Sequence, residues 1–254
     1  MTQVRFFKDL PKLSKLGTTN SLLATENATG KNYRMSAANL KTELGSISID
    51  DVMDNVFIMC HRSSDSYPAC YRPSEWATQE AAGNVATGVL LIDGGRKLVI
   101  APQEKTSTWS TCQVVCGTAS SDRLAVQELY NGKENCAKIL TNTTLAAEGD
   151  ASAVGWCNAY ERINARGKGL KAGAWWLPSF GELYLMFANY TKINYALSKI
   201  SGATLLSKNS YWSCTEHSAT LAWYLSFNDG IQVYNNKSAD RYRVRPVSAF
   251  AMAT

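Results

Sequence analysis

The sequence contains few of the residues on which most enzymes and metal sites depend. It has two histidines, His61 and His217, and its seven cysteines include no Cys-x-x-Cys pair. A closed zinc site needs four ligands, and a hydrolytic triad needs a histidine close to its nucleophile. The odd number of cysteines also fits no disulfide framework. We therefore expect no catalytic residue, no metal and no cofactor, and we expect the cysteines to be free, buried thiols.

Long apolar runs are missing as well. No segment has the length needed to span a bilayer, and residues 1–17 lack the apolar core and cleavage site of a signal peptide. The net charge of +5 comes from scattered Lys and Arg, without an arginine-rich run or a basic helix. We expect no membrane insertion, no nucleic-acid partner, and synthesis in a bacterial cytoplasm without an export signal.

Residues 211–250 contain the clearest pattern in the chain. Between residues 222 and 227 apolar and polar side chains alternate, which is the period of a half-buried strand, and an Asn-Asp-Gly turn follows. A two-residue turn would place Gln232 and Tyr234 beside the apolar row. A three-residue loop with the glycine in the left-handed region would instead place the two residues Ile231 and Val233 there. We predict the second register, because it buries more apolar surface.

This register gives the hairpin one polar face, which continues into the loops beside it. The face is rich in Tyr, Asn, Ser and Gln rather than Lys and Glu, a mixture typical of recognition surfaces. The alternative is that it is the hydrated side of an antiparallel sheet, which is polar without any ligand. We expect the ligand-binding residues to be His217, Ser218, Thr220, Tyr224, Ser226, Asn228, Gln232, Tyr234, Asn236, Ser238, Asp240 and Tyr242.

Several motifs in this stretch resemble a known family. They are YWSCTE at 211–216, Ala222-Trp223, the Asn-Asp-Gly turn and VRPVSAF at 244–250, with AWWLPSFGEL and GVLLIDGGRKLVIA further upstream. Together they resemble the C-type lectin-like domains of bacterial and phage proteins. The resemblance is greatest to the variable proteins of diversity-generating retroelements, which are related in fold to formylglycine-generating enzymes. In that family a retroelement rewrites codons on the ligand-facing side of this hairpin, while the buried frame stays fixed.

The pattern of local signals favours the same α+β architecture. Asp150 can cap a helix that runs to about Ala165 and stops at Gly167, and Ser179 with Glu182 forms a capping box for the next helix. A short third helix is expected at 193–200. The run GVLLIDGGRKLVIA reads as a buried hairpin with a glycine turn. Two main helices packed on irregular antiparallel hairpins match a C-type lectin-like fold. In such a fold we expect four tryptophans of this chain to be core residues: Trp175, Trp176, Trp212 and Trp223.

Residues 1–45 differ in composition from the rest and predict a strand, a turn at Thr29-Gly30, a second strand and a short helix. The unit formed by Gly30, Lys31, Tyr33, Met35, Ser36 and Leu40 resembles small amino-terminal modules of phage tail-fibre proteins. It implies attachment to phage structural proteins and a possible homotrimer. The alternative is an ordinary hairpin and helix packed on the main domain. We therefore divide the chain into an attachment module, 1–45, and a ligand-binding domain, 46–254, in which residues 46–82 have no assigned role.

These resemblances imply a receptor-binding protein at the tip of a phage or prophage tail fibre, located in the virion. Its partner would be a cell-surface protein or glycan. A bacterial surface adhesin is the alternative. An oxidase of the formylglycine-generating class is a further alternative, but such enzymes bind copper through two cysteines, and Cys214 has no second cysteine near it in the sequence. Calcium-dependent sugar binding is disfavoured, because the Glu-Pro-Asn and Gln-Pro-Asp tripeptides of that lectin class are missing.

Overall fold

The chain divides into two compact units, Met1–Asp54 and Asn55–Thr254. The computed structural model describes residues 21–25, 32–36, 55–65 and 67–250. In the first unit, β1 (Ser21–Thr25) pairs with β2 (Asn32–Ser36) in an antiparallel hairpin, as the sequence predicts. The predicted turn at Thr29-Gly30, the short helix after it and the domain boundary near Gly45 lie outside the described residues.

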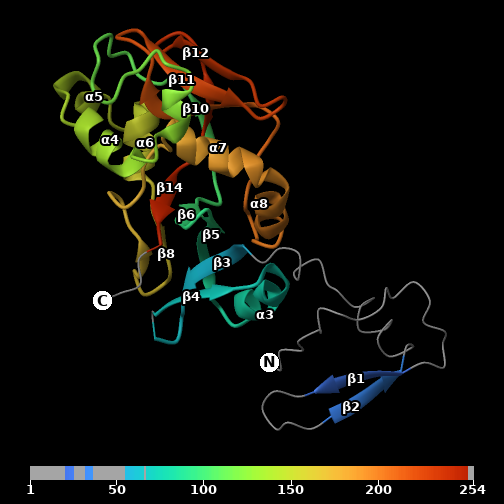
Figure 1. Cartoon of the computed structure of the whole chain (residues 1–254). Coiled ribbons are helices and arrows are strands. Elements are labelled where there is room, and N and C mark those ends of the chain that lie inside the picture. The colour runs from blue at the N-terminus through green and yellow to red at the C-terminus, as the bar shows by residue number, and fades with distance from the viewer. Residues whose placement is uncertain (1–20, 26–31, 37–54, 66, 251–254) are drawn as a thin grey trace. The chain divides into compact units, whose positions relative to one another are not determined.

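The second unit is a mixed α+β structure with two five-stranded sheets, which confirms the predicted class (Figure 1). The β10 sheet has the strand order β12-β11-β10-β13-β7, and the β5 sheet has the order β14-β6-β5-β3-β4. The strands of the β10 sheet are β7 (Lys105–Ser107), β10 (Ser210–Glu216), β11 (Leu221–Ser226), β12 (Gln232–Asn236) and β13 (Tyr242–Val244). Those of the β5 sheet are β3 (Val56–His61), β4 (Pro68–Tyr71), β5 (Val85–Asp93), β6 (Arg96–Ile100) and β14 (Val247–Ala249).

The β5–β6 hairpin forms as predicted. Asp93 pairs with Arg96, and the two residues between them, Gly94 and Gly95, have φ angles of 53° and 76°. Only glycine adopts two successive left-handed conformations at little cost, so this dipeptide determines where the chain reverses. The apolar run in β5 is buried on both faces: Val89 and Leu91 belong to the main core cluster, whereas Leu90 packs on the other side with Tyr160 and Trp175. Helix α8 (Tyr190–Leu197) packs against the same sheet.

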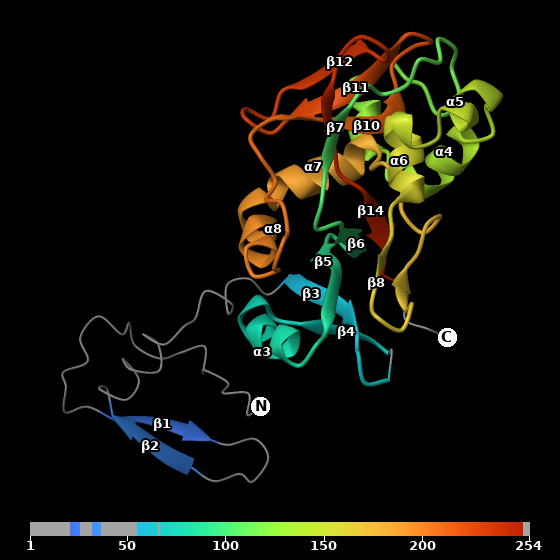
Figure 2. The same ribbon diagram turned by 180° about the vertical axis from the view of Figure 1, so that it is seen from behind.

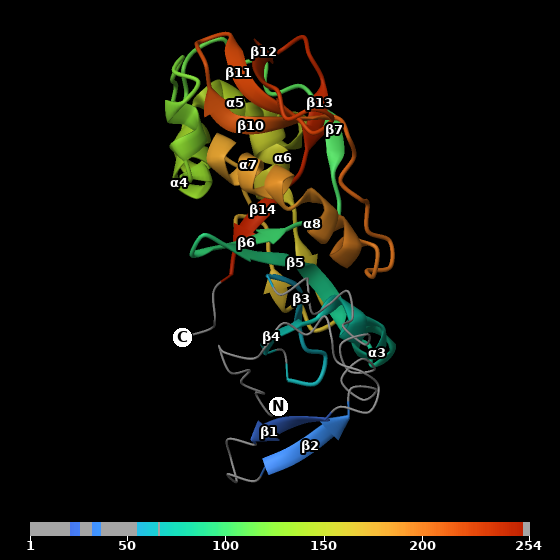
Figure 3. The ribbon, with the colours of Figure 1, turned by 45° about the vertical axis from the view of Figure 1, so that its right-hand side comes forward.

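Two successive helices connect the sheets. The predicted capping box is present at the start of α7 (Phe180–Ala188), where the Ser179 backbone N–H donates to Glu182 at 2.9 Å. Helix α7 packs against β10 and β11, and α8 packs against β3 and β5. Figure 3 shows α7 directly beside the β10 sheet, with α8 continuing toward the β5 sheet. The apolar side of α7 therefore forms much of the support beneath the β10 sheet.

The helix expected over residues 150–165 is shorter than predicted. Helix α6 (Ala153–Ala159) is capped by Ser152, whose hydroxyl accepts from the Gly155 N–H, and Tyr160 is already extended, with ψ near 140°. Residues 162–170 form the small hairpin of β8 (Arg162–Ile163) and β9 (Gly169–Leu170). The prediction was wrong because the apolar period continues past the true helix end, while Gly167 occupies a hairpin turn rather than a helix cap.

Three further helices complete the second unit: α3 (Trp76–Ala81), α4 (Gly132–Ile139) and α5 (Thr143–Glu148). Figures 1 and 2 show α4, α5 and α6 together on one side of β10 and β11. The four tryptophans are core residues, as predicted, each at most 6% exposed: Trp176, Trp212 and Trp223 in the main cluster and Trp175 in a second cluster on the β5 sheet. Among the described residues, no helix is both long and apolar enough to cross a membrane.

The predicted register of the β11–β12 hairpin is wrong by one residue. Trp223 pairs with Tyr234 and Tyr224 pairs with Val233, so Tyr234 lies on the Trp223 side of the sheet. The loop contains four residues, 227–230, because the Ser226 N–H donates to the Ile231 carbonyl at 3.0 Å. Gly230 does adopt the left-handed conformation, with φ of 73°. The extra loop residue reverses the face of every β12 side chain.

Phe227 explains the longer loop. Its ring lies 4.5 Å from the Tyr211 ring and 5.4 Å from the Phe187 ring of α7, and its backbone N–H donates to the Asn209 carbonyl. These contacts bury Phe227 and remove it from the β11–β12 ladder. The strand therefore ends one residue earlier than the alternation suggests, and that difference sets the register.

Candidate ligand-binding surface

Three aromatic residues form the centre of one side of the β10 sheet, which we call the Tyr224 face. The Tyr242 ring lies 4.3 Å from the Tyr224 ring and 4.6 Å from the ring of Trp212. The Asn235 side chain donates to the Tyr242 hydroxyl at 2.8 Å, and the Trp212 indole donates to the Ser107 carbonyl. Trp212 is fully buried beneath two partly exposed tyrosines. The result is an aromatic platform whose orientation is fixed by packing and hydrogen bonds.

The corrected register adds residues to this face that the sequence interpretation assigned to the core. Val233 lies opposite Tyr224, and Ile231 lies opposite Ser226 at the end of the hairpin. Ile231 is 52% exposed. Of the predicted ligand-binding residues, Tyr224, Ser226 and Tyr242 share this face.

A second group of predicted residues gathers where two loops meet at the opposite end of the hairpin. The loop after β10 and the loop after β12 are joined by a hydrogen bond from the Lys237 N–H to the Thr220 carbonyl at 3.0 Å. The His217 ring stacks on Tyr234 at 3.7 Å. The Asn236 side chain accepts from the backbone and hydroxyl of Ser238. This group contains His217, Ser218, Thr220, Tyr234, Asn236, Ser238 and Asp240.

Two predicted residues lie apart from both groups. Asn228 is exposed in the four-residue turn. Gln232 is buried, and its amide donates to the Arg123 carbonyl at 2.8 Å while its oxygen accepts from Gln127 at 2.8 Å. The sequence interpretation placed Gln232 on the open face, and this was incorrect because of the register. Its amide supports the loop at 123–127 instead.

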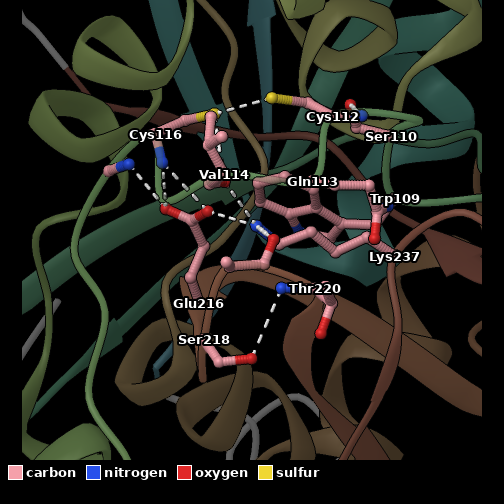
Figure 4. A network of polar contacts seen from close by, with 12 residues as sticks. Trp109, Ser110, Cys112, Gln113, Val114, Cys116, Glu216, Ser218, Thr220 and Lys237 are labelled. Carbon is pink, nitrogen blue, oxygen red and sulfur yellow. Dashed lines mark hydrogen bonds and ion pairs between the residues drawn. The ribbon is translucent and has the colours of Figure 1, made fainter.

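A buried ion pair between Glu216 and Lys237 lies beneath the two loops, and both side chains are fully buried (Figure 4). The Lys237 ammonium also donates to the carbonyls of Val114 at 3.0 Å and Ala219 at 2.8 Å. It lies 4.8 Å from the centre of the Trp109 ring, a cation–π distance. All three ammonium protons therefore have an acceptor, as a buried lysine requires.

The Glu216 carboxylate is equally well satisfied. It accepts from the backbone N–H groups of Cys116 and Gly117, which belong to the loop that also supplies the Val114 carbonyl (Figure 4). In the same loop the Cys112 and Cys116 sulfurs are 3.2 Å apart, and burial raises the pKa of Cys116 to about 12. The network thus holds three separate segments together: the 109–118 loop, the loop after β10 and the loop after β12.

The sequence interpretation did not find this pair. Glu216 ends the YWSCTE motif, but Lys237 lies in a polar run that reads as an ordinary solvated loop. A single lysine in such a run carries no local signal of burial. Only the tertiary arrangement brings the two charges into contact.

Burial also perturbs two groups near the surface. Burial, followed by a hydrogen bond with Tyr242, raises the pKa of Tyr224 to about 12, so its hydroxyl ionises only at a higher pH than that of a free tyrosine. Burial lowers the pKa of His217, whose Nδ1 has no hydrogen-bond partner among the described residues. The folded chain therefore favours the neutral imidazole at this position.

We expect the His217 environment to make stability depend on pH. Because the folded-state pKa is lowered, the unfolded chain takes up the proton first, from its ordinary value of 6.5 downward. The free energy of unfolding should therefore fall as pH drops through this range, until the folded pKa is also passed. Urea denaturation between pH 8 and pH 5 should show a steeper loss for the wild type than for His217→Gln. Identical pH profiles would contradict the expectation.

Two features bear on the chemical alternatives. His61 hydrogen-bonds Thr87 at 3.1 Å, and no cluster of three or more potential metal ligands exists within the described ranges. Cys214, by contrast, is not isolated in space. Cys136 of α4 interacts with its thiol, and burial together with this contact raises the pKa of Cys136 well above its ordinary value. The sequence interpretation missed this contact because the two cysteines are far apart along the chain.

Comparisons with known proteins place the chain in no family. No family model matches it, and no curated protein matches it. Among solved structures, it is similar to a fimbrial protein from Bacteroides ovatus, with 17% identity and a TM-score of 0.38. The match covers 61% of this chain and 36% of that protein, so the chain corresponds to little more than a third of its length.

Proposed function

We propose that this chain is a receptor-binding protein whose recognition surface is the Tyr224 face and the adjoining loops after β10 and β12. The observation that carries the proposal is the pair of partly exposed tyrosines, Tyr224 and Tyr242, held 4.3 Å apart over a buried tryptophan. Such tyrosines offer a large amphipathic contact area and have few rotatable bonds to immobilise on binding. A solvated sheet face would not require this degree of order.

The support beneath the surface favours the same function. The Glu216–Lys237 network fixes the two loops before any ligand arrives. Preorganised loops lose less conformational entropy on binding, which raises affinity without new contacts. A binding protein gains affinity from this arrangement.

The test is the effect of single substitutions on binding to cells. Labelled full-length chain would be titrated on a panel of intact bacterial strains. On a strain that binds, Tyr224→Ala should weaken binding about thirtyfold, which corresponds to roughly 2 kcal/mol for a hot-spot residue. The matched control is Tyr67→Ala, which removes a 48% exposed tyrosine between β3 and β4. Unchanged binding by Tyr224→Ala, with folding verified by circular dichroism, would exclude this surface.

The finer proposal is a C-type lectin-like variable protein at the tip of a phage tail fibre, diversified by a retroelement. It rests on the motif resemblance, with residues 1–45 proposed to attach to the particle. The neighbouring DNA should then encode a reverse transcriptase and a near-copy of the codons for residues 205–250, differing mainly at adenines. A neighbourhood with cell-surface export genes and no such copy would favour the adhesin alternative.

A further inference from the structure

A polar hollow adjoins the Tyr224 face at the edge of the β10 sheet. Its volume is about 320 Å³, near the lower end of the roughly 300–1,000 Å³ of small-molecule sites. The strands β7, β10 and β13 and the residues just before β10 and β13 supply its lining: Thr106, Asn209, Ser210, Arg241, Tyr242 and Arg243. Tyr242 lines the hollow and also belongs to the aromatic platform, so the hollow lies next to the Tyr224 face.

The arginines of this hollow are only partly neutralised. Arg241 is exposed, and its guanidinium donates to the Thr106 carbonyl at 3.2 Å. Among the described residues its other N–H groups have no acceptor, so they can bind a ligand. Arg243 approaches Glu104 at 3.6 Å, but that carboxylate already pairs with Arg245 at 2.7 Å. One carboxylate therefore serves two guanidinium groups.

The remaining lining groups complement a sugar. Asn209, Ser210 and Thr106 provide amide and hydroxyl groups that can both donate and accept, as sugar hydroxyls require. Guanidinium groups bind carboxylates and sulfates through paired, charge-assisted hydrogen bonds. A concave site of this size encloses one monosaccharide, whereas an acidic peptide would need a longer groove.

We propose that this hollow binds an acidic sugar residue, with Arg241 and Arg243 holding its carboxylate or sulfate and the amide and hydroxyl groups of the lining binding its hydroxyls. The inference rests on the proposed function, because it names the ligand class of that same surface.

The experiment measures binding of defined probes to the full chain by calorimetry. The probes are 3′-sialyllactose, its neutral counterpart lactose, a sulfated disaccharide and hexaglutamate. We expect at least one acidic sugar to bind and lactose to bind at least about tenfold more weakly. Arg241→Gln and Arg243→Gln should each weaken acidic-sugar binding about tenfold, as for loss of a charged hydrogen bond. Sialyllactose and the sulfated disaccharide distinguish a carboxylate from a sulfate as the anion.

The matched control is Arg123→Gln, because Arg123 is exposed in a different loop and should leave probe binding unchanged. The proposal is overturned if neither acidic sugar binds, if lactose binds equally, if hexaglutamate binds more tightly, or if Arg241→Gln binds like the wild type. If cell binding depends on Tyr224 but no acidic sugar binds, the acidic-sugar proposal is wrong and the receptor-binding function stands. If neither is observed, both proposals are wrong.

Discussion

Replacing Lys237 by methionine is expected to lower the free energy of unfolding by about 3–5 kcal/mol, the usual cost of breaking a buried ion pair. The substitution keeps most of the side-chain volume but leaves the Glu216 carboxylate buried without its counter-ion. The carbonyls of Val114 and Ala219 also lose their donor. Urea denaturation would measure the loss, provided that the dependence of the unfolding free energy on urea concentration is the same in both proteins.

The same substitution at Lys133 provides the control. Lys133 is exposed on α4, so Lys133→Met should change stability by no more than about 0.5 kcal/mol. The double variant Glu216→Gln/Lys237→Met should lose less than the sum of the two single variants, because no unpaired charge stays buried. Strict additivity, or a Lys237→Met variant as stable as the wild type, would mean that the pair does not hold the loops.

Trp223→Ala is expected to remove about 3–5 kcal/mol of stability, because it empties a large buried volume. Trp223 is 1% exposed, its ring lies 6.0 Å from that of Phe180 in α7, and its indole donates to the Ser120 carbonyl. The loss therefore combines packing with a hydrogen bond to a partly buried residue. Thermal and urea denaturation should both show it.

Comparing Trp223→Ala with Tyr224→Ala tests which face of β11 is buried. Tyr224 points to the opposite side of the same strand and is only partly buried. Tyr224→Ala should therefore cost clearly less stability than Trp223→Ala, while having the larger effect on cell binding. The reverse order would show that the two faces of the β10 sheet have been exchanged.

Local signals were sufficient where a short segment determines its own conformation. The Asp93-Gly94-Gly95 turn and the Ser179–Glu182 capping box each act within a few residues, and both predictions are confirmed. The start of α6 moved to Ser152 because more than one nearby side chain could cap it. Sequence analysis therefore located the hairpins and α7 well, but not the ends of every helix.

The candidate surface was predicted less well, because distant contacts decide it. Phe227 packs on Phe187 and Tyr211 instead of pairing with β12. As a result, Val233 lies on the Tyr224 face, where the sequence predicted Tyr234. The sequence pattern within residues 222–236 cannot reveal these contacts, because both partners of Phe227 lie outside it. Tyr224, Ser226 and Tyr242 were still correctly placed on one face, since their positions do not depend on the β12 register.

The acceptors that Lys237 uses in the loops are main-chain oxygens, at Val114 and Ala219. A main-chain carbonyl is present whichever side chain its residue carries. Exchanging the exposed side chains of the loops would therefore leave the anchor of each loop intact. We therefore expect substitutions of these exposed side chains to change what the loops contact while the path of the backbone stays the same.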